Sequence, residues 1–353
     1  MRIVIAPDSL KGTATAADTA DAVRAGWLAE RPDDVVTTVP MADGGEGTLA
    51  AFAAAFPGAE RVPVTVTGPA GTPVDTHWLL LPDGRAVVEL AATSGLPLLA
   101  GALQPETATS RGFGEAIAAA LDAGATGLVL GIGGSASTDG GRPVLEALGL
   151  VVAADGGLDR SALRALPAGG VVVLSDVTSP LLGPAGAVAV FGPQKGVTSE
   201  SAPALEARLA DWAGRFPEVD PATPGAGAAG GVGFGLLAWG ATVASGARAV
   251  ADVLGLPALL DGADVVVTGE GRFDEQSAAG KVPSVVRALA AEHAPGARVL
   301  LVAGEVEAPL DDYDAAASLV VLATQTTGEP DDALRDPLRF ARIAGQRLSR
   351  LVG

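Results

Sequence analysis

Short apolar runs alternate along this chain with longer segments rich in alanine and leucine. The apolar runs predict buried strands at Arg2–Ala6, Val35–Val39, Leu128–Gly131, Gly170–Leu174, Asp264–Thr268, Arg298–Ala303 and Ala317–Leu322. The longer segments predict helices at Thr15–Leu28, Thr48–Ala55, Arg111–Asp122, Ala202–Trp212, Gly233–Ala244, Pro283–His293 and Leu334–Leu351. Strands that alternate with helices are typical of an α/β protein with a largely parallel sheet.

One stretch, from Ala59 to Ala92, has a different pattern. β-Branched and polar residues alternate in Val62–Thr67, and a turn at Pro82–Arg85 leads into another apolar run. This pattern favours antiparallel strands and indicates a change of domain. We expect residues 1–70 and 281–353 to form one discontinuous domain and residues 71–280 to form a second, inserted domain. The C-terminal strands would then complete the N-terminal sheet.

Composition narrows the class of protein. The 353 residues exceed the usual size of a single core, and 48% of them are hydrophobic. A net charge of −18 argues against nucleic acid as a partner, since binding it requires Lys and Arg on phosphates. No apolar run is long enough to span a membrane. The chain has no cysteine, which excludes disulfides and fits the cytoplasmic location that we expect.

The ends of two predicted strands carry glycine and acids, as ligand sites in open α/β sheets do. In the first, Asp8 is a candidate to contact a substrate hydroxyl or a metal, and Lys11 to contact a carboxylate or phosphate. A turn in which Asp8 caps the next helix is the alternative. In the second, Asp43 and Glu46 lie three residues apart and could share a metal, or the loop could be a turn capped by Thr48.

The segment Gly131–Gly141 is rich in small residues and hydroxyl groups. A phosphate could lie against its backbone at Gly133, Gly134 and Ser135. It is not a Walker A loop, because no Gly-Lys-Ser/Thr follows at the required spacing, and it fits the GxGxxG pattern only weakly. By itself the segment indicates an anion or nucleotide loop.

Further candidates follow other predicted strands. Asp176 ends one strand, where a carboxylate is a reasonable Mg²⁺ ligand or general base, and Lys195 lies in a constrained loop. Another strand leads into a group of opposite charges, namely Glu270, Arg272, Asp274 and Lys281. Phosphoryl transfer requires acids to hold Mg²⁺ and basic groups to offset charge, although a surface ion-pair network would use the same residues.

Other chemistry has little support in the sequence. His77 and His293 are isolated, so we interpret both as structural. A zinc cluster, a cysteine nucleophile and a Ser-His-Asp triad all lack the required residues. A dinucleotide-dependent oxidoreductase would need a closer match to the dinucleotide-binding motif. It shares the α/β layout, however, so we keep it as an alternative function. A non-catalytic sensor of organic acids is the other alternative.

Taken together and in this order, the motifs resemble the bacterial glycerate kinase family, the type that contains the glucarate- and glyoxylate-pathway enzymes. The matching motifs are APDSLKG (Ala6–Gly12), MADGGEGT (Met41–Thr48), VTGPAG (Val66–Gly71), GIGGSAS (Gly131–Ser137), FGPQKG (Phe191–Gly196), GAGAAGG (Gly225–Gly231) and GEGRFD (Gly269–Asp274). Each motif is weak alone, whereas the ordered set is highly specific.

The resemblance implies a two-domain α/β architecture, with a flavodoxin-like parallel-sheet domain interrupted by an inserted second α/β domain and an active site in the cleft. It also implies a kinase that uses ATP and Mg²⁺ to phosphorylate D-glycerate, with 2-phosphoglycerate as product. One departure lies after the serine-rich loop, where Asp139 is followed by two glycines and then by Arg142 and Pro143. These two residues keep open a related sugar acid, such as tetronate, as the substrate.

These expectations assign a role to each candidate. The acid's carboxylate would be held by Lys11 or Arg272, and its attacking hydroxyl would be oriented by Asp8, Asp176 or Asp274. ATP phosphates would lie along Gly133, Gly134 and Ser135, with Lys195 or Lys281 offsetting their charge. Mg²⁺ would be held by some of Asp43, Glu46, Asp176 and Glu270. Nucleic acid and membranes are not expected as partners, and the sequence leaves a homo-oligomer open.

Overall fold

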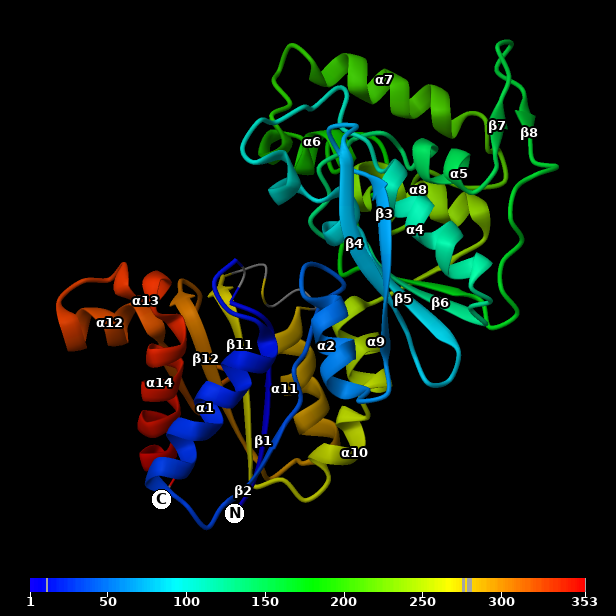
Figure 1. The fold of residues 1–353 in the computed structure, drawn as a ribbon. Coiled ribbons are helices and arrows are strands. Elements are labelled where there is room, and N and C mark those ends of the chain that lie inside the picture. The colour runs from blue at the N-terminus through cyan, green and yellow to red at the C-terminus, as the bar shows by residue number, and fades with distance from the viewer. Residues whose placement is uncertain (11, 275–276, 278–280, 353) are drawn as a thin grey trace. The chain divides into compact units, whose positions relative to one another are not determined.

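The chain folds into two compact units, and one of them is inserted in the sequence of the other (Figure 1). The computed structural model describes the chain apart from residues 11, 275–276, 278–280 and 353. The first unit consists of Met1–Asp43, Ala50–Ala55 and the chain from Ser245 onward. The second unit consists of Gly44–Leu49 and Phe56–Ala244.

The first unit is built around five parallel strands. Its elements are β1 (Arg2–Pro7), α1 (Ala16–Glu30), β2 (Val35–Thr38), α9 (Gly246–Val253), α10 (Leu256–Leu260), β11 (Val265–Phe273), α11 (Val282–His293), β12 (Arg298–Val306), β13 (Ala315–Ser318), α12 (Leu319–Thr327), α13 (Asp332–Arg335) and α14 (Pro337–Leu351). The helix α2 (Thr48–Ala55) begins in the second unit and ends in the first.

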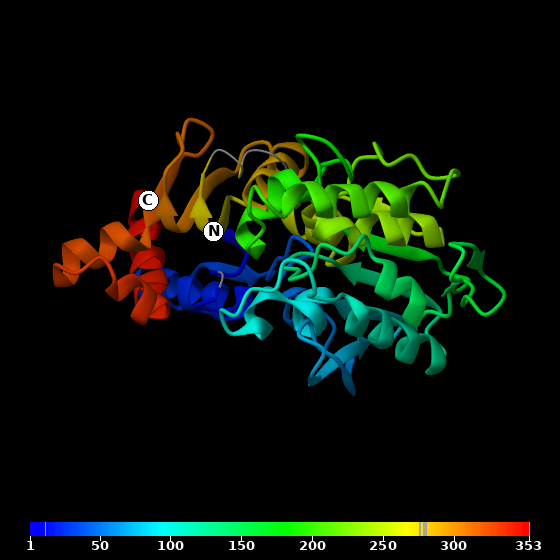
Figure 2. The same ribbon diagram turned by 90° about the horizontal axis from the view of Figure 1, so that it is seen from above.

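The strand order in the first unit is β13-β12-β11-β1-β2, with every pair parallel. Read within the unit, this is the 2-1-3-4-5 order of flavodoxin-like sheets. The run Ile3–Ala6 is buried throughout, as expected of a parallel strand covered on both faces. Helices α1 and α14 pack on one face and α11 on the other (Figure 1). In both views α12 and α13, drawn in orange, lie at one end of this unit, where they contact α14 (Figure 2).

The order in which the chain adds strands to the sheet reverses between β1 and β11, although the two strands are parallel. From β1 the chain continues to β2 on one side, whereas β11 leads to β12 and β13 on the other. Open α/β sheets bind ligands at the carboxyl ends of the strands beside such a reversal. Pro7 pairs with Gly269 at this edge, so Asp8 and Glu270 follow directly on the two central strands.

The second unit contains a mixed sheet. Its elements are β3 (Glu60–Thr67), β4 (Pro73–Leu80), β5 (Arg85–Glu89), α3 (Leu90–Ser94), the short 3₁₀ helix η1 (Leu96–Leu99), α4 (Arg111–Asp122), β6 (Gly127–Gly131), α5 (Arg142–Ala147), β7 (Val151–Val152), β8 (Leu158–Asp159), β9 (Val171–Leu174), α6 (Ala187–Phe191), the 3₁₀ helix η2 (Pro193–Lys195), α7 (Ala202–Ala213), α8 (Ala228–Trp239) and β10 (Thr242–Ala244).

The order of this sheet is β10-β9-β6-β5-β4-β3. The strands β5, β6, β9 and β10 are parallel, while β3, β4 and β5 pair in antiparallel fashion, which confirms the antiparallel prediction for this stretch. The strands β7 and β8 form a separate two-stranded ribbon. The predicted fold class, a two-domain α/β protein with parallel sheets, is confirmed.

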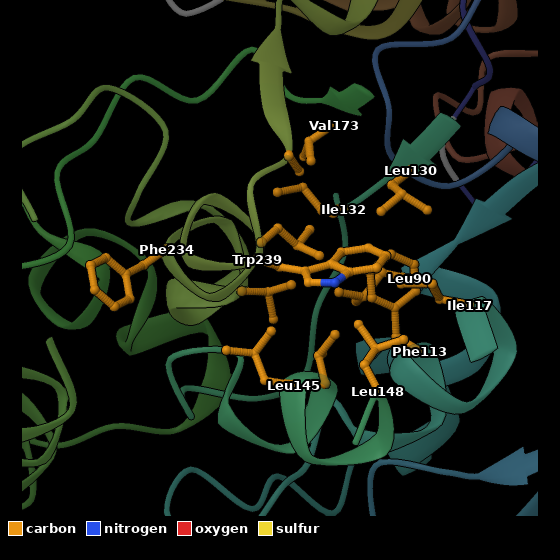
Figure 3. Packing of buried hydrophobic residues seen from close by; sticks show 14 of the residues in the cluster. Leu90, Phe113, Ile117, Leu130, Ile132, Leu145, Leu148, Val173, Phe234 and Trp239 are labelled. Carbon is orange, nitrogen blue, oxygen red and sulfur yellow. The ribbon is translucent and has the colours of Figure 1, made fainter. Parts of the chain in front are cut away.

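One large apolar core fills the second unit (Figure 3). Phe113 and Ile117 of α4 and Leu145 of α5 pack with Leu130 of β6, and all four side chains are at most 1% exposed. Trp239 lies among these side chains and donates its indole N–H to the carbonyl oxygen of Arg164 at 2.8 Å (Figure 3). This core lies within the second unit. Because such cores are closely packed, it provides a rigid support for the loops at the sheet edge.

Two predicted elements are wrong in type over their C-terminal part. The segment Ala317–Leu322 was expected to be a strand, but β13 ends at Ser318 and a helix begins at Leu319, where the Ser318 hydroxyl accepts from Val321 N–H at 3.5 Å. The predicted helix Gly233–Ala244 ends earlier, at Trp239, because Gly240 adopts φ +103° and stops it. Residues 242–244 then form β10 beside β9.

The remaining predicted helices and strands follow the predictions closely. The helices predicted at Thr48–Ala55 and Arg111–Asp122 have those bounds in the structure. The long C-terminal helix is divided, because Asp336 separates α13 from α14 and accepts from Arg339 N–H at 3.3 Å. No helix among the described residues combines the length and the apolar character needed to span a membrane.

The compact units divide the chain at other positions than the predicted domain boundaries. The sequence placed the boundaries after residue 70 and before residue 281. In the structure β3 pairs with β4, so residues from Phe56 belong to the second unit. β11 pairs with β1, so the chain from Ser245 belongs to the first. Strand pairing over long sequence separations, which composition does not reveal, sets these limits.

Candidate active site

In the first unit, acidic groups gather at the carboxyl edge of the central strands. Asp8 is 4% exposed; its N–H donates to Gly269 O at 2.8 Å, and its Oδ1 accepts from Ser9 N–H at 2.7 Å. Glu270, 2% exposed, follows on the neighbouring strand. Met41 N–H donates to Pro7 O at 2.9 Å, so the segment that leads to Asp43 runs beside the end of β1.

Lys281 supplies positive charge to this edge. Its Nζ lies 3.8 Å from Glu270 Oε2 and 3.6 Å from Asp274 Oδ1. Asp274 N–H donates to the buried Ser277 hydroxyl at 3.0 Å. The buried carboxylate of Glu270 and the half-buried one of Asp274 can bind a cation or orient a hydroxyl group, because the lysine offsets only part of their charge.

Arg272 lies on β11, and its guanidinium group already pairs with glutamate side chains. Its side chain is 59% exposed, and its Nε donates to Glu307 Oε2 at 2.8 Å. Its Nη2 also donates to Glu307 Oε1. Glu305 Oε2 lies 4.0 Å from Arg272 Nε. The hydrogen bonds to Glu307 are the main cause that raises the pKa of this guanidinium. A carboxylate ligand would compete with these partners. The other candidate for that role, Lys11, lies outside the described residues.

In the second unit, two glycine loops pack against each other at the carboxyl edge of the sheet. Gly133 N–H donates to Gly44 O at 3.0 Å, and a Cβ atom at Gly133 would lie 2.5 Å from Gly45 Cα. A Cβ atom at Gly44 would lie 2.4 Å from Leu174 O, at the end of β9. Only glycine permits such close backbone contact.

This packing gathers three of the predicted segments. The loop that carries the exposed Glu46, the segment that carries Ser135 and the strand end before the half-buried Asp176 all touch at one sheet edge. In the sequence they lie more than forty residues apart. Their shared position follows from the parallel order of β6 and β9.

Lys195 lies beneath the serine-rich segment. The residue is 2% exposed, and its Nζ donates to Ser135 Oγ at 2.6 Å and to Ser137 O at 2.5 Å. Burial lowers the pKa of this ammonium to about 7, and the charge of Asp139 opposes that change. Of the predicted phosphate-binding residues, Gly133, Gly134, Ser135 and Lys195 therefore come together, whereas Lys281 belongs to the first unit.

Asp139 is a half-buried acid to which the sequence gave no role of its own. Its carboxylate accepts from Ser110 N–H at 2.7 Å, from the Ser110 hydroxyl at 3.0 Å and from Gly141 N–H at 3.0 Å. Burial raises the pKa of Asp139, while these donors and the charge of Lys195 favour the ionised form. Its position directly before two glycines was the available signal.

Glu89 is a candidate that sequence reasoning missed. It ends β5, is 6% exposed, and accepts from Leu49 N–H at 2.8 Å and from Gly47 N–H at 3.4 Å. It thus caps the start of α2, directly after the loop that carries Glu46. Burial raises the pKa of Glu89 to about 7, with a further contribution from the charge of Glu46. The signal was a single acid in the apolar run Ala86–Leu90.

The candidate Mg²⁺ ligands are divided between the units. Asp43 and Glu270 belong to the first, and Glu46 and Asp176 to the second. Across the described part of the chain, no three acidic or histidine side chains form a ready-made metal cluster. Kinase sites hold Mg²⁺ with one or two carboxylates and the phosphates of the substrate, so these oxygen donors fit that ion without a third protein ligand.

The comparisons with known proteins cover almost the whole chain. The family model described as the glycerate kinase family matches residues 3–353. The chain is 42% identical to the glycerate 2-kinase of Escherichia coli K12, over 83% of each chain. It is 39% identical to the glycerate kinase of Bacillus subtilis 168, over 80% of each chain.

A solved structure agrees with these relatives. A crystal structure described as a candidate glycerate kinase 2 from Salmonella typhimurium LT2 superposes with a TM-score of 0.84 and 38% sequence identity. The match covers 100% of this chain and 98% of that one. The similarity therefore includes both compact units.

Proposed function

The chain belongs to the glycerate kinase family and is a phosphotransferase, and from that premise we propose that it transfers the γ-phosphoryl group of ATP to the 2-hydroxyl of D-glycerate. The products would be 2-phosphoglycerate and ADP. The name of the Escherichia coli relative, glycerate 2-kinase, supports the position. The observation that carries the proposal is the hydrogen bond from Lys195 to Ser135 in the Gly133–Ser135 segment.

The nucleotide phosphates are assigned to this segment because it can donate hydrogen bonds at close range. Gly134 adopts φ +76° and has no side chain, so a phosphate can approach its backbone. Ser135 offers a hydroxyl, and Lys195 below it adds positive charge in a chain of net charge −18. Lys281 is the second candidate for offsetting phosphate charge.

The acceptor side of the reaction needs a carboxylate-binding group and a proton acceptor. Lys11 or Arg272 would bind the glycerate carboxylate. The glycerate hydroxyl oxygen forms a bond to the γ-phosphorus, the bond from that phosphorus to the β,γ-bridging oxygen breaks, and ADP leaves. The hydroxyl proton passes to Asp8, Asp176 or Asp274. Mg²⁺ held by some of Asp43, Glu46, Asp176 and Glu270 would neutralise charge on the phosphates.

A preference for tetronate has no support from the structure. That alternative depended on Arg142 and Pro143. The Arg142 side chain donates to Glu146 Oε1 at 2.7 Å and stacks over Trp212 at 5.8 Å from the ring centroid. These contacts stabilise the surface of α5 and give the Arg142 side chain a structural role, so we propose glycerate as the acid.

The proposal is tested by ADP release with ATP, Mg²⁺ and D-glycerate from the wild type, D176N and D274N. We expect at least one of the two variants to lose about 100-fold or more in turnover, since general bases and metal-binding acids contribute that much. Glu200→Gln, an amide substitution at an exposed acid, is the matched control and should retain wild-type turnover. Full turnover in both aspartate variants would show that the site is misplaced.

A further inference from the structure

The ammonium of Lys195 is enclosed by protein backbone. Its Nζ uses two N–H groups on Ser135 Oγ and Ser137 O. On the other side lies Gly230, at φ +68°, where a Cβ atom would come within 2.9 Å of Nζ and within 2.0 Å of Ser137 O. With 2% of the residue exposed, the lysine is placed to act on the segment above it and not on solvent.

The bond from Lys195 fixes the direction of the Ser135 hydroxyl. A serine hydroxyl has one O–H donor and two acceptor lone pairs. Because the protonated lysine can only donate, Ser135 Oγ is the acceptor at 2.6 Å in that form, and its own hydrogen must point elsewhere. Among the described residues, Lys195 is the one partner found for this hydroxyl oxygen, so the O–H group is available to an anion.

The neighbouring hydroxyl groups show the same unused capacity. Within the described part of the chain, Ser137 Oγ and Thr138 Oγ1 are buried and have no hydrogen-bond partner. A buried polar atom left in this way is destabilising, and such atoms in folded proteins call for an explanation. Three hydroxyl groups within four consecutive residues therefore have hydrogen-bonding capacity that the protein itself does not use.

Asp139 does not hold Lys195 in an ion pair. Its carboxylate oxygens are bonded to Ser110 and Gly141, and the ion pairs found among the described residues include none between Asp139 and Lys195. Asp139 nevertheless acts on the lysine through its charge. The ammonium is thus balanced at a distance, while its hydrogen bonds are all directed to the serine segment.

We propose that Lys195 is a positioning residue, which does not bind phosphate itself but holds Ser135 so that the serine hydroxyl donates to a phosphate of the nucleotide. This inference rests on the proposed function, in which the nucleotide phosphates lie along Gly133–Ser135. It differs from the simpler assignment, in which the ammonium of Lys195 would contact a phosphate directly. The two assignments predict different coupling between the residues.

A double-mutant cycle separates them. The variants are S135A, K195M and S135A/K195M, with Ser199→Ala, an exposed serine, as the control. Affinity is measured with a fluorescent ATP analogue, and KM is measured for ATP and for glycerate. We expect each single variant to weaken nucleotide binding about 10-fold, which corresponds to about 1.4 kcal/mol. The double variant should lie within about twofold of the weaker single variant, and KM for glycerate should change less than about twofold.

Two results would overturn the inference. Multiplying effects, near 100-fold in the double variant, would mean that Lys195 acts independently of Ser135. Wild-type affinity in S135A would mean that the serine hydroxyl contacts no phosphate. Ser135→Thr retains the O–H group and should restore most of the affinity lost in S135A, which a purely structural role of Lys195 would not predict.

The cycle remains informative in two unfavourable cases. If K195M does not fold, as circular dichroism would show, the comparison of S135A with S135T still decides whether the hydroxyl binds nucleotide. If the wild type binds the ATP analogue but does not phosphorylate glycerate, the proposed function fails while the binding cycle still tests Lys195. The two failures are therefore distinguishable.

Discussion

At the scale of single residues, Glu89 shows how burial changes the chemistry of a carboxyl group. It is 6% exposed, and two backbone N–H groups at the start of α2 compensate only part of its lost hydration. The pKa of about 7 is raised above the usual 4.5, mainly by burial. The folded protein therefore favours the protonated form of Glu89.

This gives a prediction about stability and pH. The favourable contribution of protonated Glu89 is fully present below about pH 4.5 and is lost as the pH rises through about 7. One pKa unit corresponds to about 1.4 kcal/mol, so wild type should lose about 3 kcal/mol relative to Glu89→Gln over this range. Urea unfolding at pH 4.5, 6 and 8 measures the difference. An equal pH dependence in both proteins would contradict the shifted pKa.

The residues of the candidate site were predictable to different degrees. Ser135 and Lys195 carry a visible signal, namely a serine–glycine loop and a lysine between glycines. In the structure Lys195 Nζ lies 2.6 Å from Ser135 Oγ. Glu89 carries a weak signal because its partner Leu49 lies 40 residues away in the chain. Contacts of this kind depend on which strands are neighbours in the sheet, and periodicity does not give that order.

At the scale of elements, close backbone contact was the feature that the sequence pattern did not reveal. Helices α1 and α14 cross where both carry glycine: a Cβ atom at Gly26 would lie 1.9 Å from Arg342 O, and one at Gly345 would lie 2.2 Å from Val23 O. The sequence predicted both helices from their apolar spacing. It did not predict that they touch, because Gly26 and Gly345 are far apart in the chain.

Gly26→Ala is expected to destabilise the first unit. The added methyl group meets backbone, which cannot turn away as a side chain can, so the helices must separate. Overpacking of this kind costs about 1–3 kcal/mol or more. Gly296→Ala is the matched control, because that glycine has open space around it. Thermal unfolding should show a lower midpoint for Gly26→Ala alone, and equal midpoints would contradict the close crossing.

Helix ends explain the errors in element type. The run Ala317–Leu322 is apolar enough for a strand, but Ser318 provides a cap and the residues after it form α12. Likewise, Gly240 at φ +103° ends α8 at Trp239, and residues 242–244 form β10 instead of the last helical turn. A single polar or glycine residue decided the outcome in each case.

At the scale of the whole molecule, the sequence indicated that the C-terminal strands return to the N-terminal sheet. The parallel pairing of β1 with β11 shows this return, over 262 residues at the bond from Thr268 Oγ1 to Ala6 O. The position of the unit boundaries could not be inferred, because it depends on the pairing of β3 with β4. Both units nevertheless present their candidate groups at the carboxyl edge of parallel strands.

The most direct test of the central claim is to identify the product made from D-glycerate and ATP. Purified protein would be incubated with Mg²⁺, ATP and a panel of short hydroxy acids, and any phosphorylated acid would be identified by phosphorus and carbon NMR. We expect D-glycerate to be consumed with formation of ADP and a phosphate ester at carbon 2. Folded protein that phosphorylates none of the acids, or that places the phosphate on carbon 3, would contradict the proposed reaction.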